Sequence, residues 1–114
     1  MSTSKLLIWL DDERDPKDSR WESYFPINDP DVIWVKSYEE FVVWISSKEF
    51  PDAICFDHDL GDGPSGYDAA KWLTQHCLTN GLKLPLWNIQ SANPIGKENI
   101  VSLLKSFERI MESQ

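Results

Sequence analysis

Two groups of acidic residues stand directly after short apolar runs of the chain. The run 6–10 leads into Asp11-Asp12-Glu13, and the run 53–56 leads into Asp57-His58-Asp59. Short apolar runs bounded by polar residues are typical of buried strands in a parallel sheet. Because ligands bind beyond the carboxyl ends of such strands, we expect these carboxylates to meet at one edge of the sheet. Negative charges at such short separations require a compensating cation, and Mg²⁺ (or Mn²⁺) suits a site made only of oxygen ligands.

The acidic residues differ in how directly they are expected to bind that metal. Asp12 and Asp57 are the first candidates, Asp11 follows, and Asp59 is the fourth. Glu13 is expected to point into solvent. A single acidic group would more simply be a polar loop before a helix, since acidic side chains favour that position. A second group at the equivalent end of another strand favours the metal site.

The residues at the end of the second run also suggest catalytic roles. Asp57 is suited to accept a phosphoryl group as a nucleophile, or to act as a metal ligand and general base, and the residues alone leave both open. An imidazole such as that of His58 is suited to general acid–base catalysis. An equally good interpretation makes His58 a loop residue paired with Asp59 or Asp62.

A third polar group, Ser91, Asn93 and Lys97, follows the predicted strand 84–89. Helix N-termini favour anions, so Ser91 and Asn93 are candidates for binding phosphate, with Lys97 one turn further on as a positive charge. Ser91 and Lys97 are for that reason also candidates for assisting catalysis. The simpler alternatives are that Asn93 caps a helix and that Lys97 is a solvated surface lysine.

Strand and helix patterns alternate along the whole chain. Strands are predicted over 5–10, 31–36, 53–56 and 84–89. Helices are predicted after the caps Ser37 and Asn93 and over 66–78, while 15–26 is either a short helix or an ordered loop. This spacing favours right-handed crossovers and a parallel sheet with helices on both faces.

Length and composition limit the classes of protein that the chain can represent. Its 114 residues suit one domain, 1–114, and a 41% hydrophobic content with six Trp excludes a disordered chain. The formal charge of −8 argues against a broad nucleic-acid surface. Signal-peptide and membrane-spanning patterns are lacking, so we expect a cytoplasmic protein with no membrane partner. Cys55 and Cys77 form neither a metal motif nor a disulfide framework.

Three stretches resemble a known family. They are Leu10-Asp11-Asp12-Glu13-Arg14, Asp57-His58-Asp59-Leu60-Gly61 and the stretch 91–100, SANPIGKENI. They are similar to the marks of the cyclic-phosphate processing receiver domains, a compact group related to response-regulator receiver domains. The resemblance implies a three-layer α/β/α, flavodoxin-like fold with four parallel strands in the order 2-1-3-4. It also implies Mg²⁺ held by the acidic pair, a phosphoacceptor position at Asp57, and a hydroxyl-bearing switch residue at Ser91.

The chain departs from the pattern of ordinary receivers after its predicted strand 84–89, and from the pattern of the compact group at residue 90. A receiver has a fifth strand with a lysine that clamps the phosphoryl group, whereas this chain passes from strand 84–89 into one final helix. Lys97 is then the nearby basic candidate. Gln90 stands where the compact group often has a histidine, so no acid–base role is transferred from that position.

The resemblance implies metal-dependent phosphate-ester chemistry, the processing of a cyclic phosphate on a nucleotide or at an RNA end. The metal would polarise the phosphoryl oxygens and activate water, and His58 would move the proton. The acidic net charge favours a small phosphorylated ligand or a short RNA terminus as the partner. Two alternatives stay open: a signalling domain phosphorylated on Asp57, and a binding module that holds metal or phosphate without turnover. Neither the substrate nor the oligomeric state follows from the sequence.

Overall fold

A sheet of four parallel strands forms the centre of the protein, in the order β2-β1-β3-β4. In the computed structural model, which describes residues 4–113, the strands are β1 (Leu6–Leu10), β2 (Asp31–Val35), β3 (Ala53–Phe56) and β4 (Leu86–Ile89). The predicted strand order is confirmed, and three of the strands are one or two residues shorter than predicted. Leu10 pairs with both Val35 and Phe56, so three strands end at the same edge of the sheet.

Residues 4–113 contain four helices, and those predicted to follow the caps Ser37 and Asn93 begin at these caps. The four helices are α1 (Tyr38–Ser47), α2 (Gly66–Asn80), α3 (Pro94–Glu112) and the short 3-10 helix η1 (Ser19–Tyr24). Ser37, Ser65 and Asn93 each accept a hydrogen bond from a backbone N–H in the first turn of the helix that follows. No helix within residues 4–113 is both long enough and apolar enough to cross a bilayer.

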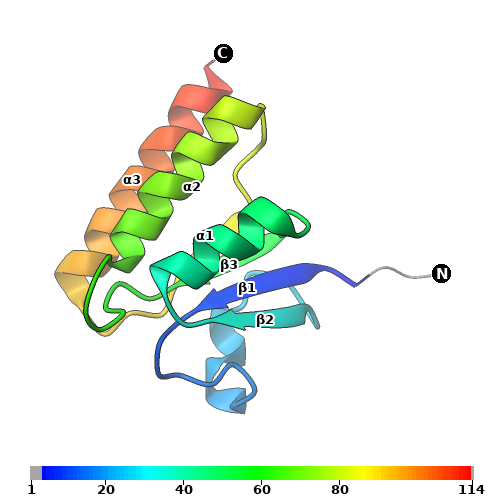
Figure 1. Ribbon diagram of the computed structural model, residues 1–114, viewed down its shortest axis with the longest axis vertical. Helices are drawn as coiled ribbons and strands as arrows, with labels where there is room; N and C mark the ends of the chain where they lie inside the picture. Colours follow the sequence, from blue (N-terminus) through cyan, green and yellow to red (C-terminus); the bar gives the residue numbers. More distant parts are fainter. Residues whose placement is uncertain (1–3, 114) are drawn as a thin grey trace.

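One face of the sheet is covered by all three α-helices. Figure 1 shows α1 lying in front of the strands, with α2 and α3 side by side above it. The strand residues of this face, such as Ile8 and Ile54, are fully buried against helix residues that include Phe41, Leu73 and Leu104. This interdigitated layer is the larger of the two hydrophobic cores.

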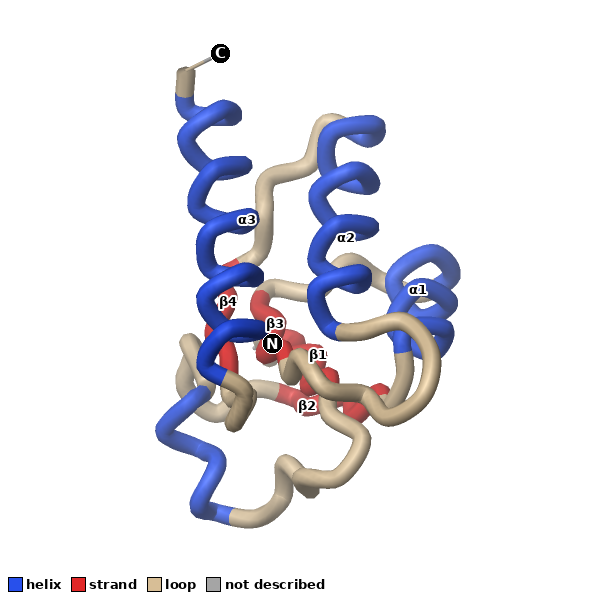
Figure 2. Tube along the Cα trace, turned by 90° about the vertical axis from the view of Figure 1, so that its left-hand side faces the viewer, coloured by secondary structure: helices blue, strands red, loops and turns tan. Residues whose placement is uncertain are grey.

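The other face is covered by the connection between β1 and β2. Trp9 and Cys55, which point to this face, are fully buried against the aromatic residues of that connection, among them Trp21, Tyr24 and Phe25. The rings of Trp9 and Phe25 meet edge to face, with centroids 5.6 Å apart. Figure 2 shows the strands between the α-helices and this loop with its 3-10 helix. Three layers are therefore present, and the segment 15–26, which the sequence left open, contains a short 3-10 helix.

The outer edge of β4 is the place where a receiver carries its next strand. No fifth strand is found within the described residues, since α3 follows β4 and β4 ends the sheet. The N–H groups of Leu86 and Gln90 point toward β3, so those of Trp87 and Ile89 point outward. The side-chain oxygen of Asn88 accepts the Ile89 N–H at 2.8 Å and closes one of these two positions.

Candidate metal and phosphate site

Three aspartates meet where β1 and β3 end. The paired strands bring Asp11, Asp12 and Asp57 together, and one carboxylate oxygen of each lies within 4.8 Å of the others. Asp11 is fully buried and Asp57 is 4% exposed, whereas Asp12 is partly exposed. The structure thus brings together three of the four predicted metal ligands, and their role as ligands stays a prediction.

Asp11 is held by four hydrogen-bond donors. Its Oδ1 accepts the backbone N–H groups of Glu13 (2.9 Å) and Arg14 (2.8 Å). Its Oδ2 accepts Nη1 of Arg14 at 3.1 Å and the side-chain amide of Gln90 at 3.4 Å. A carboxylate buried this deeply is tolerated because both oxygens are satisfied. Asp11 therefore fixes the start of the β1–β2 connection as well as contributing charge to the site.

Arg14 is the site residue to which sequence reasoning gave no role. Its Nη1 lies 3.1 Å from Oδ2 of Asp11 and 3.5 Å from Oδ2 of Asp57, so one guanidinium faces two of the three carboxylates. Burial works to lower the pKa of Arg14, but the hydrogen bond to Asp11 and the charges of Asp11 and Asp57 outweigh it and raise the pKa. The available signal was a basic side chain three positions after Asp11 in an otherwise acidic turn.

The surroundings of Asp57 raise the pKa of its carboxyl group. Burial and the nearby charge of Asp11 raise the pKa of Asp57 to about 6, against the opposing charge of Arg14. Its backbone is also tightly packed, because a Cβ at Gly66 would lie 1.8 Å from the carbonyl oxygen of Asp57. The first residue of α2 must therefore be a glycine for the helix to approach the site this closely.

His58 turns toward α3. Its ring packs against Gly96, where an added Cβ would lie 2.3 Å from the imidazole Cγ. The Nδ1 of His58 is 3.1 Å from Oδ1 of Asp59, and this hydrogen bond lowers the pKa of Asp59. Of the two interpretations of His58, the pairing with Asp59 is the one that the geometry displays. Its catalytic role stays a prediction.

Asp59 and the residues after β4 lie around the three carboxylates rather than among them. The side chain of Asp59 is 65% exposed and does not join the group of three. Asn93 caps α3 through a bond from Gly96 N–H (2.9 Å), and its amide lies 3.5 Å from Asp59. The Ser91 hydroxyl accepts the Asn93 N–H, and Lys97 is exposed on α3. The phosphate-binding and catalytic roles predicted for Ser91, Asn93 and Lys97 remain predictions.

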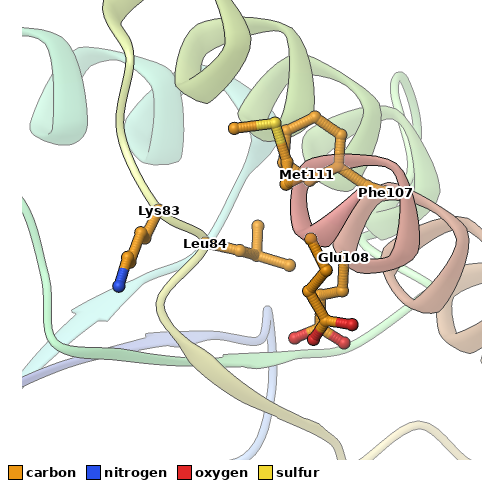
Figure 3. A pocket seen from close by; sticks show the side chains of 6 residues that line it. Lys83, Leu84, Phe107, Glu108 and Met111 are labelled. Carbon is orange, nitrogen blue, oxygen red and sulfur yellow. The ribbon is translucent and has the colours of Figure 1, made fainter. Parts of the chain in front are cut away.

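An open pocket of about 350 Å³ lies over the carboxylates. Its wall consists of Asp12, Glu13, Arg14, Asp57, Asp59, Gly61 and Ala92. A somewhat larger pocket of about 420 Å³ lies beyond the amino end of β4, between Leu84 and the apolar side chains Phe107 and Met111 of α3 (Figure 3). Glu108 and Glu112 line that pocket, but they belong to no group of three metal-ligating side chains within the described residues, so its size alone does not make it the functional site.

The donors of the acidic pocket fit a hard divalent cation. Asp11, Asp12 and Asp57 supply only oxygen atoms, which is the ligand set that Mg²⁺ and Mn²⁺ take from proteins. Gln90 is buried beside Asp11. Among the buried side-chain nitrogen and oxygen atoms of the described residues, its Oε1 is the one without a hydrogen-bond partner. An unpartnered oxygen beside an acidic group is consistent with a site that is completed by a cation or its water.

A parallel sheet in this order, with aspartates at the carboxyl ends of β1 and β3, is the arrangement that the resemblance to receiver domains predicts. The model of the family described as "Cyclic-phosphate processing Receiver domain" matches residues 6–106. The chain therefore belongs to that family. No curated protein matches the chain.

Solved structures with the same fold include response regulators. The N-terminal domain of a response regulator/sensory box/GGDEF protein from Carboxydothermus hydrogenoformans is 16% identical, with a TM-score of 0.53 over 96% of this chain and 98% of that one. The Mn²⁺-bound form of response regulator Rcp1 is 16% identical, with a TM-score of 0.55 over 93% and 91%. A fusion that carries a coiled-coil segment of yeast Spc42 is also 16% identical, with a TM-score of 0.60 over 97% and 81%. Identities this low show the receiver fold alone.

Proposed function

We propose that this domain binds Mg²⁺ or Mn²⁺ through Asp11, Asp12 and Asp57 and acts on phosphate esters, with a cyclic phosphate on a nucleotide or RNA terminus as the substrate. The observation that carries the proposal is the convergence of three carboxylate oxygens within 4.8 Å in an open pocket. The family to which the chain belongs supports the choice of a cyclic phosphate. The net charge of −8 favours a small ligand over a long nucleic acid.

The bound metal would supply a Lewis acid for the phosphoryl oxygens and lower the pKa of a bound water. The protein's own residues then have separate tasks. Asp11, fixed by backbone N–H groups, keeps the cluster in place, and Asp12 and Asp57 present their oxygens to the pocket. His58, oriented by Asp59 through Nδ1, would exchange a proton with the reacting group through Nε2.

The test is a panel of 2′,3′-cyclic nucleotides and a short RNA with a 2′,3′-cyclic phosphate end, each incubated with Mg²⁺ or Mn²⁺. We expect ring opening that EDTA abolishes and that Asp12→Asn removes. Asp62→Asn is the matched control, because Asp62 is an exposed aspartate outside the carboxylate cluster. Intact substrates with the wild-type protein would contradict the enzymatic proposal. Thermal stabilisation by those nucleotides without turnover would favour the binding module instead.

A second candidate is a phosphoacceptor domain, favoured by the position of Asp57. Asp57 directly follows β3 beside the other two carboxylates, and the structural neighbours include response regulators. Incubation with acetyl phosphate and Mg²⁺ would then add one phosphoryl group, detected by intact mass and absent in Asp57→Asn. An unchanged mass of the wild-type protein would eliminate this candidate. The lack of a fifth strand within the described residues counts against signalling through the usual receiver surface.

A further inference from the structure

We propose that Arg14 is the anion-binding cation of the acidic pocket, and that in the metal-free protein it serves as the internal counter-ion of Asp11 and Asp57. A divalent ion would take over those carboxylates and leave the guanidinium free to bind the phosphoryl oxygens of a ligand. This inference rests on the proposed metal and phosphate chemistry and assigns a residue to it.

Position is the first reason. Arg14 is the positively charged residue in the pocket wall, whereas Lys97 is exposed on α3 and outside that wall. Among residues 4–113 there is no fifth strand that could present another basic side chain to the site. A phosphoryl group held over the carboxylates would therefore meet Arg14 as its cationic side chain.

Competition for the same oxygens is the second reason. The two backbone N–H groups that donate to the Asp11 carboxylate both use Oδ1. The guanidinium of Arg14 occupies Oδ2 of Asp11 and also lies 3.5 Å from Oδ2 of Asp57. A metal that binds both carboxylates needs oxygens that the guanidinium now occupies. Two cations at such a short separation also repel each other. Metal binding and the Arg14 ion pairs should therefore oppose each other.

Anchoring is the third reason, because it keeps a released guanidinium at the pocket. The Arg14 carbonyl accepts the indole N–H of buried Trp9 at 2.8 Å, and the Arg14 N–H is bonded to Asp11. The guanidinium also lies over the ring of Trp21, with 5.4 Å from its carbon to the ring centroid. A planar guanidinium with several donors suits phosphate oxygens better than a single ammonium does.

Charge balance gives the fourth reason. The three ionised carboxylates carry three negative charges, which a divalent ion and Arg14 together neutralise. Without Arg14 the metal-loaded cluster keeps one negative charge and repels a phosphate. Arg14 should therefore weaken metal binding and strengthen phosphate binding, and these opposite effects separate its role from simple support of the fold.

The experiment measures both affinities in Arg14→Gln. Mn²⁺ binding is followed by isothermal titration calorimetry, and binding of inorganic phosphate at saturating Mg²⁺ is followed by ³¹P NMR. We expect Mn²⁺ to bind about tenfold more tightly and phosphate about tenfold more weakly, as one interaction worth about 1.4 kcal/mol predicts. Arg20→Gln is the matched control, since Arg20 also stacks on Trp21 but pairs with Asp18 on the surface. It should leave both affinities unchanged.

Arg14→Lys gives a second, milder variant in case Arg14→Gln unfolds, which circular dichroism would reveal. It should keep the metal affinity near that of the wild type and bind phosphate at an intermediate strength. Changes in the same direction for metal and phosphate, or no change in either, would overturn the assignment. A wild-type protein that binds no Mn²⁺ would instead refute the proposed metal site itself. If the wild type binds Mn²⁺ and phosphate and Arg14→Gln binds them equally well, only the role assigned to Arg14 is refuted.

Discussion

The two faces of the sheet are built in different ways. On one face three α-helices bury aliphatic residues such as Ile54 and Leu104 completely. On the other face a loop with a short 3-10 helix covers the strands with aromatic rings. Two of these rings also make directed hydrogen bonds, since the indole N–H groups of Trp9 and Trp34 donate to the carbonyls of Arg14 (2.8 Å) and Asp11 (2.7 Å).

Because of this difference, the helical face mainly determines the stability of the protein, and the aromatic face mainly determines the geometry of the acidic site. The helical face gains its free energy from buried apolar area, which is not directional and does not orient the carboxylates. The aromatic face uses directed N–H bonds to backbone carbonyls of the very turn that carries Asp11 and Arg14. Substitutions on the first face should therefore lower the free energy of unfolding, and substitutions on the second should change ligand affinity.

The largest effect is expected on the helical face. Leu104 in α3 is fully buried, so Leu104→Ala should lower the free energy of unfolding by about 2–5 kcal/mol in urea denaturation. Leu78→Ala, at a residue of α2 that is 50% exposed, is the control and should cost far less. Mn²⁺ affinity, measured well below the transition, should stay unchanged in both. A loss of Mn²⁺ affinity in folded Leu104→Ala would break the separation between the faces.

A second prediction concerns pH and the buried carboxylate at the edge between the faces. Asp57 has a pKa of about 6 in the folded protein, above its ordinary value of 3.8. The folded state therefore binds this proton more tightly than the unfolded state, and stability is lost as the pH rises from about 4 through 6. In metal-free protein at pH 7.5, Asp57→Asn should be more stable than the wild type, by about 3 kcal/mol at most.

Thermal melts of both proteins between pH 4 and 8 measure this effect. The advantage of Asp57→Asn should shrink toward pH 4 and should also diminish when Mg²⁺ is added to the wild type. Asp59→Asn is the control, because Asp59 is exposed and its pKa is lowered rather than raised. Equal stability of wild type and Asp57→Asn at every pH would show that Asp57 carries no electrostatic penalty.

The smallest effect is expected from a comparison of the same substitution, Trp→Phe, on each of the two faces. Trp34→Phe removes the indole bond to the Asp11 carbonyl, and Trp87→Phe removes a bond of 3.2 Å to Glu108. Each should lower the free energy of unfolding by about 1 kcal/mol, the value of one hydrogen bond. Mn²⁺ affinity by calorimetry should fall by about threefold in Trp34→Phe alone, since an interaction of roughly 0.7 kcal/mol gives that factor. Equal Mn²⁺ affinities in the two variants would contradict the special role of the aromatic face.

The sequence predicts the helical face well because its signals are local. Apolar runs give the strands, and Ser37 and Asn93 give the helix starts through hydrogen bonds to residues three positions away. The convergence of Asp11 and Asp57 follows from the strand order alone, since neighbouring parallel strands end at one edge. These features need no knowledge of side-chain conformations.

The remaining parts depend on contacts that sequence spacing does not encode. The segment 15–26 has aromatic residues at helical spacing, yet its rings pack on the sheet from a loop and a single 3-10 helix. Arg14 reaches the carboxylates because Asp11 fixes its backbone, and that bond exists only once the turn has formed. His58 turns toward α3 because Gly96 leaves room for its ring, a fit between segments far apart in the chain.

The outward amides of β4 have a consequence for self-association. An exposed strand edge is a template on which a second chain can extend the sheet and begin a fibre. Here the strand is only four residues long, and Asn88 already occupies the Ile89 amide. The Trp87 N–H and the outward carbonyls of Trp87 and Ile89 are left for another chain to pair with, so this short edge offers little support for templated growth.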